Sequence, residues 1–101
     1  MKDKIGIKKE YWANGQIKWE TPYKNGERDG IAKYWYEDGQ IGYEILYKNG
    51  KRDGIEKYWY DNGQIKYILI WKQDKLIKRL NNPVEINGEY SDGLSYVVNK
   101  E

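Results

Sequence analysis

The residue types that carry most enzymatic acyl transfer are nearly missing from this chain. It contains no histidine and no cysteine, and its two serines, Ser91 and Ser95, both lie near its end. A catalytic nucleophile needs a neighbouring base and an orienting group within hydrogen-bond reach. We therefore expect that the chain is not an enzyme. The absence of cysteine also excludes a disulfide framework and a thiolate metal site.

Carboxylates are the remaining candidates for acid–base chemistry or metal binding. Glu20 and Glu44 fall opposite Lys9 and Lys33 in the register derived below, which favours surface ion pairs over paired-carboxylate catalysis. The acidic residues at turns are Asp29, Asp38, Asp53 and Asp61. They lack the alternating oxygens of a calcium loop, and the glycine-rich turns lack the strand-to-helix context of a phosphate loop. We expect no metal and no cofactor.

Aromatic and basic residues are interleaved in two segments, 33–36 and 57–60, and the chain has 11 tyrosines and 5 tryptophans. Such a pattern can stack the bases of a single nucleic-acid strand. It can equally supply anchors for a protein partner, because Trp, Tyr and Arg dominate interface energetics. We prefer the second interpretation, since most of these tyrosines fall on a packing face. The candidate partner-binding residues are Tyr11, Trp35, Lys57, Trp59, Arg28 and Arg52.

A repeat with a period of 24 residues positions these side chains. The segment 7–17 returns as 31–41 and again as 55–65, each time ending in Gly-Gln-Ile. We therefore divide residues 1–78 into three repeats, and residues 79–101 form a separate C-terminal cap. The three repeats are 7–30, 31–54 and 55–78. Periods of this length are typical of proteins built from stacked supersecondary units.

Turn signals within the repeats predict β-hairpins. Asn-Gly or Asp-Gly dipeptides stand at 14–15, 25–26, 38–39, 49–50 and 62–63. These dipeptides favour two-residue type I′ turns, because both central residues adopt φ > 0. No segment shows helical periodicity. The predicted fold is all-β, a single-layer antiparallel meander of three hairpin repeats.

Two-residue turns would fix the register and sort the side chains onto two faces. Trp35 would lie opposite Gly42, and Tyr36 opposite Ile41. Gly6, Gly30 and Gly54 would lie opposite Tyr23, Tyr47 and Trp71, while Tyr23 and Tyr47 would face Arg28 and Arg52. The packing face would carry Trp12, Ile17, Trp19, Tyr23, Tyr34, Tyr36, Ile41, Tyr43, Ile45, Tyr47, Tyr58, Tyr60, Ile65, Tyr67, Leu69 and Trp71. The opposite, mixed face would carry Trp35, Lys57 and Trp59 and be largely solvated.

The third repeat turns the mixed face apolar, because Ile68 and Ile70 replace Glu44 and Leu46. Another part of the protein should cover this apolar part of the mixed face. We expect the segment 79–101 to do so, with one or two short strands around Asn87-Gly88 and Asp92-Gly93, since terminal repeats need caps. A dimer contact at Ile68 and Ile70 is the alternative.

The string Asn-Gly-Gln-Ile-Lys, followed by Tyr-Lys-Asn-Gly-Lys-Arg-Asp-Gly or its near twin at 23–30, resembles the MORN-repeat variant of many bacterial proteins, over residues 3–78. The resemblance implies an elongated β-meander used for protein interaction, and several bacterial members look like antitoxin or immunity components. This sequence departs from the pattern at Pro22, which should interrupt a strand, and at Gln73-Asp74, which replaces the expected turn.

The function we expect is a non-enzymatic, cytoplasmic module that inhibits or neutralises a protein partner. That partner would be a toxin, a nuclease or an effector complex, such as a host CRISPR nuclease blocked by a phage. A self-assembling scaffold is the first alternative and single-stranded nucleic-acid binding the second. The net charge of +2 is too small to indicate a polyanion partner, and no apolar segment is long enough for a membrane helix.

Overall fold

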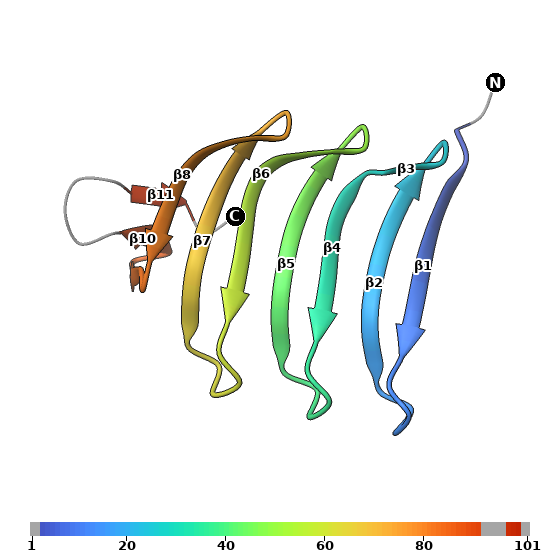
Figure 1. Ribbon diagram of the computed structural model, residues 1–101, viewed down its shortest axis with the longest axis horizontal. Helices are drawn as coiled ribbons and strands as arrows, with labels where there is room; N and C mark the ends of the chain where they lie inside the picture. Colours follow the sequence, from blue (N-terminus) through green and yellow to red (C-terminus); the bar gives the residue numbers. More distant parts are fainter. Residues whose placement is uncertain (1–2, 92–96, 100–101) are drawn as a thin grey trace.

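The protein is a single-layer antiparallel sheet, as the repeat predicts (Figure 1). The computed structural model describes residues 3–91 and 97–99, and all regular elements in them are strands. The strands of the main sheet are β1 (Ile5–Tyr11), β2 (Ile17–Lys24), β3 (Glu27–Arg28), β4 (Gly30–Trp35), β5 (Ile41–Lys48), β6 (Lys51–Trp59), β7 (Ile65–Lys72) and β8 (Lys75–Asn81). They pair in chain order, with the two-residue β3 paired beside β2.

A second, three-stranded sheet follows the main one, in the order β11–β10–β9. Its strands are β9 (Val84–Ile86), β10 (Glu89–Ser91) and β11 (Val97–Asn99). Asn87 and Gly88 connect β9 to β10 with φ values of 52° and 79°, as a type I′ turn requires. The other turn expected in this segment, Asp92-Gly93, lies outside the described residues. Residue 78, the expected end of the third repeat, lies within β8.

The turns at one end of the strands are the predicted type I′ turns. Asn25 and Asn49 both have φ of 52°, and Gly26 and Gly50 both have φ of 82°. The segment 73–74 forms the same kind of turn without any glycine, with φ of 46° and 67°. The prediction of type I′ turns is therefore confirmed at 25–26 and 49–50.

The turns at the other end are of a different type, and the prediction for 14–15, 38–39 and 62–63 is wrong. Only their glycines have positive φ, for example 92° at Gly39. The Tyr36 N–H donates to the Gln40 carbonyl (2.8 Å), and the Gly39 N–H donates to the Tyr36 carbonyl (3.0 Å). This is a three-residue loop closed by a glycine bulge. The Asp38 carboxylate accepts the Gln40 N–H (2.9 Å), and this local bond holds the loop.

The bulge changes the register at that end of each hairpin. Trp35 pairs with Ile41, so the predicted pairs of Trp35 with Gly42 and of Tyr36 with Ile41 are wrong. A second irregularity, between Tyr34 and Trp35, leaves Gly42 unpaired and restores the predicted register from Tyr34 onward. A Cβ at Gly42 would lie 3.0 Å from the Tyr36 ring. A side chain at position 42 would therefore require the Tyr36 ring to shift. The equivalent positions of the first and third repeats are Lys18 and Lys66.

The register away from the bulges agrees with the prediction. Lys33 pairs with Glu44, and Lys9 pairs with Glu20. The expected glycine–aromatic pairs form as well: Gly6 with Tyr23, Gly30 with Tyr47 and Gly54 with Trp71. Tyr23 pairs with Arg28, and Tyr47 pairs with Arg52.

Pro22 does not interrupt its strand, contrary to our expectation, because β2 runs through it to Lys24. Its Cα partner on β1 is Ile7. Its carbonyl oxygen points the other way and accepts the N–H of Asp29 (3.1 Å). Proline is tolerated at this place because its missing N–H would face the irregular stretch after β3, not a regular ladder.

One side of the main sheet, which we call the tyrosine face, is built from rings that pack across neighbouring strands. Ring centroids lie 4.8 Å apart between Trp19 and Tyr34, and 4.4 Å apart between Tyr58 and Tyr67. Tyr43 lies 4.6 Å from Tyr58 and joins the two groups. These rings are only half-buried. They stabilise the sheet by lateral contact between aromatic rings.

The opposite side, which we call the tryptophan face, is the side of Trp35, Lys57, Trp59 and Ile68. At β7 and β8 it carries a closed apolar cluster in which Ile68 and Leu80 have no exposed surface and Tyr90 of β10 is buried. Ile65 packs against this cluster and pairs with Trp59. Ile65 therefore lies on the tryptophan face and not on the predicted packing face. The same correction applies to Ile17 and Ile41, which form the equivalent pairs with Tyr11 and Trp35.

Candidate partner-binding surface

Three large aromatic side chains recur at one position of the repeat on the tryptophan face. Tyr11, Trp35 and Trp59 each form the pair that follows a glycine bulge, and the Cα partner is an isoleucine every time. Equivalent strands are two apart in the sheet, which spaces the three rings by about 10 Å. Tyr11 is 60% exposed, and the two tryptophans are partly exposed. The structure thus brings together three of the six predicted residues in one row, which we call the aromatic row.

The backbone of the aromatic row is held by rings from the preceding repeat. The indole N–H of Trp12 donates to the Trp35 carbonyl (3.0 Å), and the Tyr36 hydroxyl donates to the Trp59 carbonyl (2.6 Å). These bonds fix the main chain of both tryptophans without using their side chains. The row is therefore preorganised, which lowers the entropy cost of binding.

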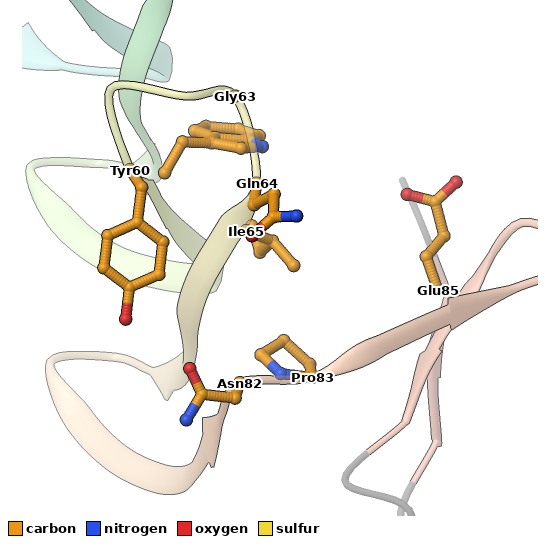
Figure 2. Close-up of a pocket in the computed structure, with 8 residues that line it drawn as sticks. Tyr60, Gly63, Gln64, Ile65, Asn82, Pro83 and Glu85 are labelled. Carbon is orange, nitrogen blue, oxygen red and sulfur yellow. The ribbon is translucent and has the colours of Figure 1, made fainter.

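A hollow opens beside Trp59 where the chain leaves the main sheet (Figure 2). Its volume is about 430 Å³, and the segment after β8 supplies one wall with Asn82, Pro83 and Glu85. The remaining lining comes from Trp59, Tyr60, Gly63, Gln64 and Ile65. In Figure 2 Tyr60 lies on one side of the strand that carries Gln64 and Ile65, and Pro83 and Glu85 lie on the other side. Among the described residues, only the third repeat has a hollow of this kind, because only there does the segment after β8 lie beside the aromatic row.

A smaller, apolar hollow of about 120 Å³ lies in the middle of the same face. Ile31 and Leu46 are 45% and 37% exposed there, and Ile55 completes the apolar lining. Glu44 and Lys57 stand at its rim. The ammonium of Lys57 also lies 5.4 Å from the Tyr90 ring centroid, so this predicted residue links the hollow to the covered cluster.

Arg28 and Arg52 are placed away from the aromatic row, on the tyrosine face and near the type I′ turns. The Arg28 guanidinium lies 4.3 Å from the Tyr47 ring centroid, and its Nη1 donates to the Tyr47 hydroxyl (3.1 Å). Arg52 lies 3.7 Å from the Trp71 ring and forms an ion pair with Asp74 (3.5 Å). Both arginines bridge successive hairpins, so each already has partners within the sheet.

Sequence reasoning missed Glu56, the buried carboxylate of the tyrosine face. Only 3% of it is exposed. Its Oε1 accepts the indole N–H of Trp71 (2.6 Å), and its Oε2 accepts the hydroxyl of Tyr58. A signal was present, because the equivalent positions are Lys8 and Ala32 and no other repeat places an acid there. The arrangement is a satisfied polar contact between strands, which is how buried charges are tolerated.

Two tyrosines around Glu56 should make the fold sensitive to alkali. Burial raises the pKa of Tyr43, and burial together with the hydrogen bond to Glu56 raises the pKa of Tyr58. The unfolded chain loses these protons near pH ~10 while the folded chain keeps them, so stability falls as the pH rises above that value.

The measurement for this prediction is the urea midpoint at about pH 9 and about pH 11. We expect a lower midpoint at the higher pH and a smaller decrease in Tyr58→Phe, which has one hydroxyl fewer to ionise. Equal midpoints at both values would contradict the raised pKa values.

Neither metal binding nor a membrane helix is indicated within the described ranges, 3–91 and 97–99. There, no three acidic side chains gather closely enough to hold a metal ion. The same residues include no helix of the length and apolarity that crossing a membrane requires. Within the same part of the chain, the lysine–glutamate pairs predicted at 9 with 20 and at 33 with 44 face each other in register, but their side chains form no ion pair.

Comparison with protein families gives one result that agrees with the repeat. A family model described as the MORN repeat variant matches three tandem segments, 4–25, 28–49 and 52–73. Together these segments span more than half of the chain, and their starts are 24 residues apart. No curated protein and no solved structure matches the chain significantly.

Proposed function

The chain belongs to the MORN repeat variant family, and from this membership we propose that it is a non-enzymatic module that binds another protein and inhibits or neutralises it. Proteins with these repeats are in general binding modules, not enzymes. The observation that carries the proposal is the aromatic row, with its partly exposed tryptophans, its exposed Tyr11 and the hydrogen-bonded backbone of both tryptophans. Its partner is a toxin, a nuclease or an effector complex, met in the cytoplasm, where a chain without cysteine needs no oxidising environment.

The tryptophan face suits a protein partner because it combines apolar, aromatic and charged groups within one plane. The row provides the large rings that dominate interfaces, and the central hollow with Ile31 and Leu46 provides a place for an apolar side chain. Glu44 and Lys57 offer opposite charges at its rim. A sheet face of this kind blocks a partner by covering its surface, without any chemistry.

Nucleic-acid binding is less well supported, for a reason that lies on the tyrosine face. Bases would need free ring faces, but several rings there already carry a cation. Arg28 covers Tyr47, Arg52 covers Trp71, and Arg79 lies 4.4 Å from the Tyr67 ring. Stacking of bases on these rings would first have to displace the cations.

The proposal predicts that Trp35→Ala weakens partner binding about 30-fold or more, as expected when a central anchor is removed. The partner is first captured with the tagged chain, identified, and required to be present in near-equal amount. Its affinity for the purified wild type and variant is then measured by calorimetry. Because Trp35 accepts the Trp12 hydrogen bond through its backbone carbonyl, the circular-dichroism melt should be nearly unchanged.

Two further variants test whether the loss of binding is specific to the aromatic row. Trp59→Ala removes a second ring of the row and should weaken binding as well. Leu76→Ala removes an exposed side chain from β8 and should have no effect on binding. Unchanged affinity in both tryptophan variants would refute the role of the row, and a collapsed melt in Trp35→Ala would show that this ring is structural.

A further inference from the structure

The strand β1 forms one edge of the main sheet and is exposed along its whole length. It pairs with β2 alone, and each of its seven residues is exposed. Ile5 is 78% exposed and Ile7 is 58% exposed, both on the tryptophan face. An exposed, apolar edge strand is a ready template for pairing with another strand.

The free hydrogen-bonding groups of this edge belong to alternate residues. The N–H and C=O of Lys4 are both engaged by Asn25, on the side of β2. Since successive residues of an antiparallel strand direct these groups to opposite sides, Ile5, Ile7 and Lys9 present theirs to the open edge. The position of Pro22 opposite Ile7 agrees, because no ladder bond between these two residues is lost to the missing N–H.

We propose that β1 pairs with β1 of a second copy of this chain, antiparallel and across a two-fold axis at Ile7. Successive strands of the path from β1 to β8 are antiparallel, so its first and last strands run in the same direction (Figure 1). Joining β8 of one copy to β1 of the next by simple translation would therefore require a parallel pair. Two β1 strands related by a two-fold axis continue the antiparallel pattern of the sheet.

Charge complementarity selects this edge and this register. With Ile7 on the axis, Glu10 of each copy lies opposite Lys4 of the other, and Lys8 lies opposite Gly6. Moving the axis to Lys8 would place the two Lys8 side chains opposite each other, and moving it to Gly6 would place Lys4 opposite Lys8. Like charges directly opposite destabilise a strand pair, so the axis at Ile7 is favoured.

The other edge of the sheet lacks this complementarity. The strand β8 also exposes apolar side chains, Leu76 and Ile77. Its charged residues are Lys75, Lys78 and Arg79, and it contains no acid. Two copies of β8 would repel each other, which is a common way of protecting an edge strand from pairing.

Sedimentation velocity on the purified chain tests the proposal. We expect a concentration-dependent dimer for the wild type and a monomer for Ile7→Lys, which places two ammonium groups at the axis. Glu10→Lys should raise the dimer dissociation constant about tenfold by facing Lys4 of the second copy. The double variant Lys4→Glu with Glu10→Lys should restore wild-type dimerisation, because the two charges are exchanged.

The matched control is Ile77→Lys, which adds the same charge at a similarly exposed isoleucine of β8 and should leave the dimer unchanged. A wild type that stays monomeric at its highest soluble concentration overturns the proposal. So does a dimer that survives Ile7→Lys but is lost in Ile77→Lys. These outcomes can be told apart from a failure of the proposed inhibitory function, because Trp35 and Trp59 lie on other strands and the variants leave Tyr11 of β1 unchanged.

Discussion

Replacing Leu80 with alanine is expected to lower the free energy of unfolding by about 3 kcal/mol, because it opens a cavity in the best-enclosed cluster of the described residues. Leu80 of β8 has no exposed surface and packs with Ile68 and Tyr90. Tyr90 comes from β10, so this cluster is where the second sheet docks on the first. Loss of the leucine therefore weakens both β8 and the docking of the segment that follows it.

The strand itself offers a matched control. Leu76 is also a leucine of β8, but it is 52% exposed, so Leu76→Ala should change stability by no more than about 0.5 kcal/mol. Urea unfolding followed by tryptophan fluorescence measures both variants. Similar losses of stability in the two variants would mean that the effect comes from truncating any leucine of β8, and not from opening a cavity in the covered cluster.

Replacing Glu56 with alanine should cost about 3 kcal/mol as well, by a different mechanism. The carboxylate accepts hydrogen bonds from Trp71 and Tyr58, and bonds to a charged group contribute about 1.5 kcal/mol or more each. The second repeat has Ala32 at the equivalent position, buried in the same sheet. The backbone therefore accommodates alanine, and the loss reports on the two hydrogen bonds.

Glu44→Ala is the control for this prediction, because Glu44 lies on the neighbouring strand but on the other face, at the rim of the central hollow. It should leave the urea midpoint nearly unchanged. Glu56→Gln keeps one acceptor oxygen and should lose less stability than Glu56→Ala. If Glu56→Ala unfolds at the wild-type urea concentration, water has replaced the carboxylate at both donors and the mechanism is wrong.

The same dipeptide forms two different turns in this chain, which shows where local sequence signals become insufficient. Asn-Gly at 25–26 forms a type I′ turn, whereas Asn-Gly at 62–63 forms a loop with only glycine at positive φ. In the second case the Asn62 side chain accepts the N–H of Gln64 (2.9 Å). The glutamine that follows each of these loops was the available signal. The Asn-Gly dipeptide by itself predicts a type I′ turn and does not predict the glycine bulge.

The wrong turn type at these three loops placed the isoleucines that follow them on the wrong face in the prediction, because one extra residue changes the alternation of side chains. The tryptophans stayed on their predicted face, since they precede the loop. The candidate partner surface was therefore predicted in part. Its row of rings followed from the repeat, but the isoleucines beneath it and the wall beside Trp59 did not.

The amino-acid sequence by itself determined the meander, its 24-residue period and most of its register. These properties are local, because turn residues and alternating side chains act within a few positions of one another. Only the tertiary structure decided what buries Glu56, what covers Ile68 and which cation lies over which ring. Those contacts join residues from strands that are separate in the chain, so their energies depend on several strands meeting at once and no short segment encodes them.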